Sequence, residues 1–215
     1  SWSDIEHRLG GDDWIISRQS SAVRVIGYLA AWEMGAKLIA TLDDDCRPAG
    51  YKLFESHIEA MYGPSRWFNT TPGHRPRGLP YRNTGDFDNA AMNVGLWRNV
   101  GDWDAATSLA CEADLTEYDP PAETRIVPTR QYLPVSSMNL AYCRGALPLA
   151  YMPPMGLNSP YDRFEDIWSG LVAKLICDHL RWYVTVGPPI VEHKRASDPF
   201  VNLVKEAPGV GVNEW

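Results

Sequence analysis

Apolar and polar positions follow one another along the chain in a way that predicts helices and strands in turn. Residues 17–35 predict an amphipathic helix that ends at Gly35, because small and apolar side chains recur there at helical spacing: Val23, Ile26, Gly27, Ala30 and Ala31. Residues 37–42 form a short apolar run before three acidic residues, which predicts a strand. A helix followed by a strand and a polar loop is typical of an α/β fold.

Two further helices and several strands are predicted downstream. Residues 50–62 form a helix whose apolar side comprises Leu53, Phe54, His57, Ile58 and Met61. Residues 161–181 form the clearest helix, with a stripe of Phe164, Ile167, Trp168, Leu171, Leu175, Ile176 and Leu180. Strands are predicted at residues 66–70, 92–97, 131–143 (one or two strands, broken at Pro134) and 182–186. Glycine and proline predict a long surface loop at residues 71–88 and a turn at residues 187–189.

Composition limits the class of protein. The chain has 215 residues, of which 45% are hydrophobic and 22% charged, which describes one globular domain or at most two small ones. The net charge of −7 argues against binding to nucleic acid or anionic lipid by bulk charge. Apolar runs too short for a bilayer predict no membrane span. Four cysteines without a CxxC pair are interpreted as reduced thiols of a cytoplasmic protein.

Three consecutive aspartates, Asp43 to Asp45, follow the strand predicted at residues 37–42. Strand side chains alternate between faces, so Asp43 and Asp45 are expected to point one way and Asp44 the other. Two neighbouring carboxylates repel each other unless a cation lies between them, and Mg²⁺ or Mn²⁺ suits such oxygen ligands. We therefore expect metal-bridged diphosphate binding; the alternative is a solvated acidic turn. An aspartyl-phosphate mechanism lacks the Thr or Val it needs after the acids, where Cys46 stands.

Acidic residues also gather where the helix at residues 161–181 begins. Asp162, Glu165 and Asp166 share one face of its first turn. They either cap the helix, where its dipole favours negative charge, or supply a general base that faces the metal site.

Two groups of basic residues are candidates for phosphate contacts. His193 can complete a metal shell, and the adjacent Lys194 and Arg195 can neutralise a diphosphate. Three arginines in the long loop either form an anion clamp or are merely solvated: Arg75, Arg77 and Arg82. The other histidines are interpreted as structural or exposed.

Several segments, in order, resemble the reversibly glycosylated polypeptides, the UDP-arabinopyranose mutase family. LIATLDDDC resembles the family's metal-binding strand, and RWFNT with RGLPYR resembles the segment around its glycosylated arginine. GLWRNVGDWDA and SSMNLAYCR are similar to two further family segments, and YDRFEDIWSGLVAKLICDHL and HKRASDPFVNLVKE match almost word for word. The similarity spans residues 3–206.

This resemblance implies a GT-A-like α/β fold with a mixed sheet flanked by helices. Residues 1–206 would form one domain that lacks the family's first strand, and residues 207–215 a C-terminal tail. The resemblance also implies a UDP-sugar and Mn²⁺ or Mg²⁺. The metal ligands would be Asp43, Asp45 and His193, and Asp166 or Glu165 would lie beside the sugar. Arg77 falls at the glycosylated arginine, and we interpret it as a diphosphate contact first and a glycosyl acceptor second. The remaining residues expected to bind the nucleotide are Asp44, Lys194, Arg195 and Arg82.

The leading hypothesis is thus a metal-dependent UDP-sugar enzyme. It would either interconvert the pyranose and furanose forms of the sugar or transfer the glycosyl group to an acceptor. The alternative is a non-catalytic sugar-nucleotide-binding subunit of a hetero-oligomer. Neither nucleic acid nor a membrane span is expected, and both a homo-oligomer and a hetero-oligomer remain open.

Overall fold

The computed structural model describes residues 1–16, 20–50, 52–63, 77, 90–110, 120–155, 159–194 and 198–214. In chain order the helices and strands of these residues are α1 (Trp2–Leu9), η1 (Asp13–Ile15), η2 (Ser21–Arg24), α2 (Val25–Glu33), β1 (Leu38–Leu42), β2 (Cys46–Pro48), α3 (Leu53–Tyr62), β3 (Ala90–Asn99), α4 (Ala105–Ala110), β4 (Arg125–Ile126), β5 (Asn139–Cys143), η3 (Arg144–Ala150), α5 (Glu165–Leu180), β6 (Tyr183–His193) and α6 (Pro199–Asn213). The strand expected at residues 66–70 and the loop at residues 71–88, apart from Arg77, lie outside this range.

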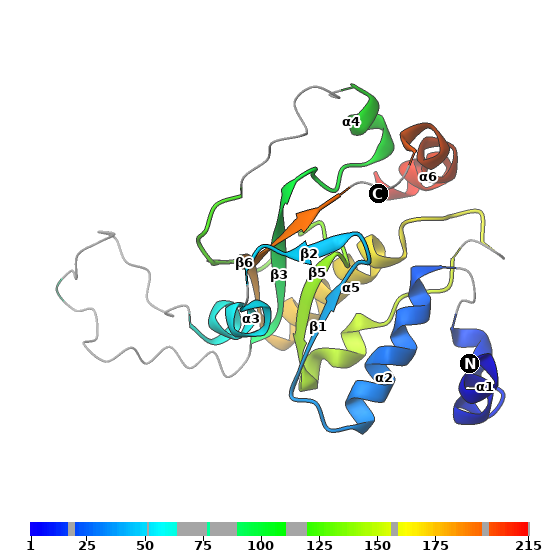
Figure 1. Cartoon of the computed structure of the whole chain (residues 1–215), viewed down its shortest axis with the longest axis horizontal. Helices are drawn as coiled ribbons and strands as arrows, with labels where there is room; N and C mark the ends of the chain where they lie inside the picture. The colour runs from blue at the N-terminus through cyan, green and yellow to red at the C-terminus, as the bar shows by residue number, and fades with distance from the viewer. Residues whose placement is uncertain are drawn as a thin grey trace.

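Six strands form one mixed sheet in the order β1-β5-β3-β6-β2, with β4 paired to β6 (Figure 1). Strands β3 and β6 run parallel, whereas β1 pairs with β5, β5 with β3, and β2 with β6 in antiparallel fashion. The expected α/β class, with a mixed sheet flanked by helices, is confirmed.

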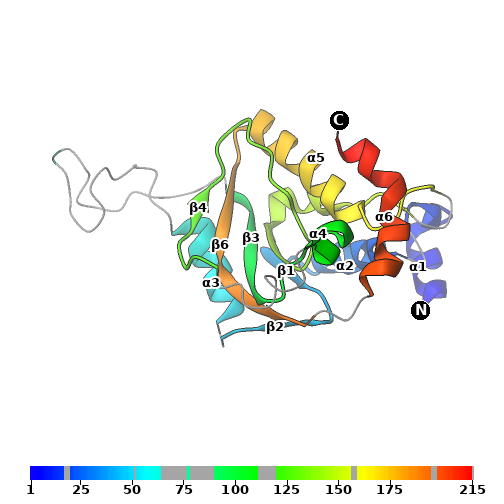
Figure 2. The ribbon, with the colours of Figure 1, turned by 90° about the horizontal axis from the view of Figure 1, so that it is seen from above.

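The sheet lies between two layers of helices (Figure 2). Alternation along β1 shows the division: Ile39 packs in the main core with α2 and α5, while Leu38 and Ala40 pack against Met61 of α3. On β5, likewise, Leu140 packs in the main core, while the adjacent Ala141 packs in the cluster around Met61. Helices α4 and α6 pack against each other beyond the ends of β3 and β6 (Figure 1).

Helix α5 turns a different side to the sheet than its apolar stripe suggests. The stripe residues Leu175 and Leu180 are 53% and 46% exposed. The buried positions are mostly small or polar: Glu165, Ser169, Gly170, Ala173, Lys174 and Cys177. A Cβ atom on Gly170 would overlap the side chain of Val135, so the absence of a side chain at Gly170 lets α5 pack directly against Val135.

The buried Lys174 of α5 is neutralised within its own helix. Its Nζ lies 2.7 Å from Oδ1 of Asp178 and also donates to the carbonyl oxygen of Pro128 at 3.1 Å. Pairing of this kind makes burial of an ammonium group tolerable.

The turn expected at residues 187–189 is wrong, because these residues lie within the continuous strand β6. Their carbonyl groups are held by two buried amides: Asn93 Nδ2 donates to Pro188 O at 3.0 Å, and Asn139 Nδ2 donates to Pro189 O at 2.9 Å. His57 links the two amides, with Nδ1 3.0 Å from Asn93 Nδ2 and Nε2 3.1 Å from Asn139 Oδ1. Side-chain hydrogen bonds thus replace regular pairing at the shift in β3–β6 register.

Helix α6 continues through Asn213, so most of the tail expected at residues 207–215 is helical. Its first turn is capped by Asp198, whose Oδ1 accepts a hydrogen bond from the Phe200 amide at 2.8 Å. Gly209 packs directly against the ring of Phe164, which joins α6 to the start of α5. Within the described ranges, none of the helices has both the length and the apolar character needed to cross a bilayer.

Candidate functional site

The aspartate triplet forms a tight turn at the end of β1. The Asp43 amide donates to the Met138 carbonyl at 3.2 Å, and the Cys46 amide donates back to the Asp43 carbonyl at 3.1 Å. Asp43 and Asp45 are half-buried while Asp44 is exposed. The two half-buried carboxylates therefore serve different partners, and the turn separates them where a straight strand would have aligned them.

Asp45 meets His193. Strand β2 pairs with β6 so that Cys46 lies opposite His193, which places the preceding Asp45 beside the imidazole. Asp45 Oδ2 lies 3.2 Å from His193 Nε2, and the backbone amide of Lys194 donates to the Asp45 carbonyl at 3.3 Å. The structure thus brings together two of the three residues predicted to hold a metal.

The second nitrogen of His193 defines what this pair can do. Nδ1 lies 2.9 Å from the carbonyl oxygen of Val100, which can only accept, so Nδ1 carries a proton. If the imidazole is neutral, Nε2 carries no proton and its lone pair faces the Asp45 carboxylate. Two hydrogen-bond acceptors then oppose each other, and they require a cation between them. Either a proton on Nε2 or a bound metal meets this need, and a ligating histidine commonly donates its other N–H to a backbone carbonyl. Asp45 and His193 therefore fit a divalent cation.

Asp43 has a cationic side chain as its partner. Arg24 Nη2 lies 2.7 Å from Asp43 Oδ1, and Arg24 Nη1 donates to the Ser137 carbonyl at 3.3 Å. Burial alone would lower the pKa of Arg24, but the charge of Asp43 and its hydrogen bond outweigh burial and raise that pKa. Among the described residues no group of three or more His, Cys, Asp or Glu side chains is arranged as a metal site.

Beside the triplet lies a polar cavity of about 380 Å³. It is bounded by η2, the turn after β1, the connection between β3 and α4, the segment before β5, the start of α5, and α6. Of the described residues, seven carboxyl groups and three cationic side chains line it. The charged lining residues are Arg24, Asp43, Asp102, Asp104, Asp162, Arg163, Glu165, Asp166, Lys205 and Glu206. An acidic cavity of this kind suits sugar hydroxyl groups and metal cations better than a bare diphosphate.

Glu165 and Asp166 both line this cavity at the start of α5. Glu165 Oε1 accepts from the Ser21 hydroxyl at 2.8 Å, whereas Oε2 is buried and has no hydrogen-bond partner in the described part of the chain. Asp166 Oδ2 accepts from the Ser137 amide at 2.9 Å. Burial, opposed by that hydrogen bond and reinforced by the charges of Asp102 and Glu165, raises the pKa of Asp166 to about 6. These positions agree with a role beside a ligand for both residues.

The remaining predicted site residues are either exposed or outside the described part of the chain. Arg77 is exposed in a turn, and the structure describes no contact between it and the cavity. Lys194 is exposed and Asp44 points to solvent. Arg82 and Arg195 lie outside the described residues.

The structure adds six charged lining residues that the motifs did not single out, and three of them show how they were missed. Arg24 lies in the helix predicted at residues 17–35, and an arginine on such a helix is normally interpreted as solvent-exposed. Asp102 lies inside GLWRNVGDWDA, a segment quoted for its family likeness but not for its chemistry. Glu206 is 8% exposed and joins α6 to the cavity wall: Oε1 accepts from Arg163 Nε at 3.0 Å and Oε2 from the Ala105 amide at 2.8 Å.

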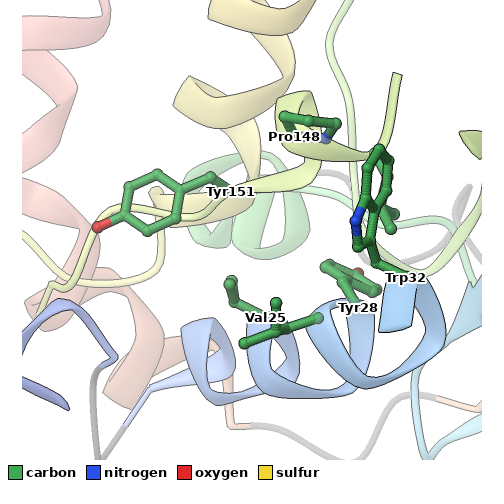
Figure 3. Close-up of a pocket in the computed structure, with 7 residues that line it drawn as sticks. Val25, Tyr28, Trp32, Pro148 and Tyr151 are labelled. Atoms are coloured by element: carbon green, nitrogen blue, oxygen red, sulfur yellow. The ribbon is translucent and has the colours of Figure 1, made fainter. Parts of the chain in front are cut away.

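A second hollow of about 320 Å³ lies between α2 and η3 and is almost entirely apolar. Figure 3 shows Tyr28 and Trp32 of α2 facing Pro148 across it. The guanidinium of Arg144 lies 4.1 Å from the centre of the Trp32 ring. Since this groove offers few polar groups, the polar cavity is the candidate active site.

Comparison with known proteins shows the family of the chain. The model of the protein family described as "Reversibly glycosylated polypeptide" matches residues 1–215. The chain is 35% identical to UDP-arabinopyranose mutase 3 of Arabidopsis thaliana over 228 residues, which cover 97% of this chain and 60% of that protein. It is 37% identical to probable UDP-arabinopyranose mutase 2 of Solanum tuberosum over 229 residues, with the same coverage of 97% and 60%. The chain thus spans about 60% of the length of these relatives. It belongs to the reversibly glycosylated polypeptide family, as the resemblance of its motifs predicted.

Proposed function

We propose that this chain acts on a UDP-sugar and interconverts the pyranose and furanose forms of the sugar. Its relatives are named UDP-arabinopyranose mutases. The observation that carries the proposal is Glu165, which lines the polar cavity, is 4% exposed and has one buried carboxyl oxygen, Oε2, without a hydrogen-bond partner among the described residues. A buried acceptor without a donor costs free energy, and a sugar hydroxyl group would supply that donor.

We further propose that Asp45 and His193 hold a divalent cation, Mn²⁺ or Mg²⁺. The donor set supports this, because His193 Nδ1 is committed to Val100 and its Nε2 faces a carboxylate. When bound, the cation would supply positive charge for the diphosphate of the substrate. Asp43 stays with Arg24 in this arrangement and holds that guanidinium against the cavity wall.

Such a cation would lie next to the polar cavity, which is lined by Asp43 and not by Asp45 or His193, and would add positive charge there. Carboxyl groups outnumber cationic side chains among its described lining residues by seven to three. A nucleotide diphosphate brings further negative charge to this region, so binding without added positive charge would be unfavourable. Charge balance therefore supports metal dependence of the proposed reaction.

The test is to incubate the protein with UDP-arabinopyranose and Mn²⁺ and to separate the products by chromatography. We expect UDP-arabinofuranose without any added acceptor. Glu165→Gln should slow the reaction by at least about tenfold, because the amide replaces the unpartnered carboxyl oxygen. Asp12→Asn, which alters an exposed carboxyl group outside the cavity, is the matched control. Equal rates for Glu165→Gln and the unmodified protein would contradict the assignment of this cavity.

The same experiment separates the other functions. A glycosyltransferase would release UDP only after an acceptor is added, and it would form no furanose product. A non-catalytic subunit would bind UDP in a calorimeter without turnover. Either result would overturn the mutase proposal.

A further inference from the structure

Arg163 is a cationic residue of the polar cavity to which the motifs assign no role. It lies two residues before α5, and its side chain is 39% exposed. Its backbone has a φ of 68°, in the left-handed region that residues other than glycine rarely adopt. Strain of this kind is often kept at ligand contacts, but Arg181 shares the conformation at the end of α5. The role of Arg163 therefore has to follow from its side-chain contacts.

The guanidinium group of Arg163 is held through one nitrogen only. Arg163 Nε donates to Glu206 Oε1 at 3.0 Å, whereas Glu206 Oε2 accepts from the Ala105 amide at 2.8 Å. Glu206 is 8% exposed, and each of its two oxygens has a donor of its own. None of the hydrogen bonds found among the described residues involves Nη1 or Nη2 of Arg163. These two nitrogens form a planar pair of donors that a ligand can use.

The other two cationic side chains of the cavity are engaged differently. Arg24 uses both terminal nitrogens within the protein: Nη2 binds Asp43 Oδ1 at 2.7 Å, and Nη1 donates to the Ser137 carbonyl at 3.3 Å. Lys205 Nζ lies 3.7 Å from a carboxylate oxygen, and an ammonium group offers a point charge in place of a fork. Among the described lining residues, Arg163 is thus best suited to bind two oxygens of one anionic group.

One short connection joins Glu206 to the proposed cation position. His193 Nδ1 donates to the Val100 carbonyl at 2.9 Å, and the Ala105 amide donates to Glu206 Oε2. Both contacts belong to the connection between β3 and α4, whose middle lines the cavity. The proposed cation and the guanidinium group of Arg163 are therefore anchored to opposite ends of the same backbone segment.

We propose that Arg163 binds the diphosphate of the UDP-sugar, with Nη1 and Nη2 donating to its oxygen atoms. This inference rests on the proposed function, which supplies the diphosphate. Because seven carboxyl groups are among the described lining residues, a diphosphate needs positive charge where it binds. Arg163 adds that charge beside the cation proposed at Asp45 and His193. Glu206 holds the guanidinium group in place before the ligand arrives, so less conformational freedom is lost on binding.

The test measures the affinity of the full chain for UDP by calorimetry in the presence of Mn²⁺. Arg163→Gly removes the side chain and suits the left-handed backbone, so the variant should fold. We expect its dissociation constant for UDP to rise by at least about tenfold. Arg163→Lys keeps the charge without the fork, so its affinity should lie between those of the unmodified protein and Arg163→Gly. Arg181→Gly is the matched control, because Arg181 has a φ of 59° and does not line the cavity; it should bind UDP like the unmodified protein.

The outcomes separate this inference from the proposed function. A dissociation constant of Arg163→Gly within about threefold of the unmodified value would overturn the diphosphate contact and leave the mutase proposal intact. An equal loss of affinity in Arg181→Gly would also overturn the contact, because net charge would then explain the effect.

The remaining outcomes concern the unmodified protein and folding. Weaker UDP binding by Arg163→Gly, without conversion of UDP-arabinopyranose by the unmodified protein, would support the contact and overturn the mutase proposal. Absence of UDP binding by the unmodified protein would overturn both. If Arg163→Gly fails to fold, Arg163→Lys decides: a folded variant that binds UDP as tightly as the unmodified protein would contradict binding by the guanidinium fork.

Discussion

Asp45 Oδ2 lies 3.2 Å from His193 Nε2, although 148 positions of the chain separate the two residues. The antiparallel pairing of β2 with β6 produces this contact, because it sets Cys46 opposite His193. The Val100 carbonyl then fixes the orientation of the imidazole through Nδ1. Three separate segments thus define one candidate cation position.

The first prediction concerns metal affinity. Asp45→Ala and His193→Ala should each weaken Mn²⁺ binding by at least about tenfold, because each removes one of two adjacent ligand atoms. Titration followed by electron paramagnetic resonance of free Mn²⁺ measures this without any substrate. Asp12→Ala should leave the affinity unchanged, and an unaltered affinity in both site variants would contradict the metal position.

The second prediction concerns the coupling of Asp102 and Asp166. The negative charge of Asp102 contributes to raising the pKa of Asp166 to about 6, so Asp102→Asn should lower that pKa. Titration of the ¹³C carboxyl resonance of Asp166 measures the change, with Asp12→Asn as the control. A pKa that does not move would show that the two groups are independent.

The third prediction concerns stability in acid. Burial lowers the pKa of His57 to about 4, below its usual value of 6.5. As the pH falls below 6.5, His57 becomes protonated in the unfolded chain, whereas in the folded protein it stays neutral until about pH 4. Stability is therefore fully present above pH 6.5 and falls as the pH drops, by about 3 kcal/mol at most.

Urea unfolding at pH 7 and pH 5 of the unmodified protein and His57→Gln measures this contribution. The variant should lose less stability between the two values, even if it is less stable at both. His7→Gln alters an exposed histidine of α1 and should keep the original pH dependence. An identical slope for His57→Gln would show that His57 carries no pH-dependent stability.

The fourth prediction concerns the close contact under α5. Gly170→Ala should destabilise the protein by about 1–3 kcal/mol, since the added methyl group overlaps Val135. Gly211→Ala in α6, where no atom lies within 4 Å of the new methyl group, should be neutral or stabilise by up to about 1 kcal/mol. Chemical denaturation of both variants measures the difference. Equal stabilities would show that Val135 yields freely to the added methyl group.

Local pattern was enough for several elements of the fold. The apolar run before the aspartates is strand β1, and the periodic segment at residues 161–181 is helix α5. Pattern was insufficient for the orientation of α5, because a hydrophobic stripe records apolarity and does not show that Gly170 packs directly against the Val135 side chain. It also misassigned residues 187–189, whose place within β6 depends on amides from β3 and β5.

The candidate site shows the same division. The identities of the acids and of His193 predicted a carboxylate and imidazole site, and the structure brings Asp45 and His193 into contact. The role of Arg24 could not be read from spacing, because it depends on a contact with Asp43, 19 positions further along the chain.

The order of residues by itself determined the α/β class, the strand that leads into the aspartates, and the family to which the chain belongs. Only the tertiary structure decided that Asp43 binds Arg24 while Asp45 binds His193, and that a polar cavity collects carboxyl groups from four separate segments. The physical reason is that side-chain periodicity follows from local backbone geometry, whereas hydrogen bonds and charge pairs depend on distances that folding sets between remote parts of the chain.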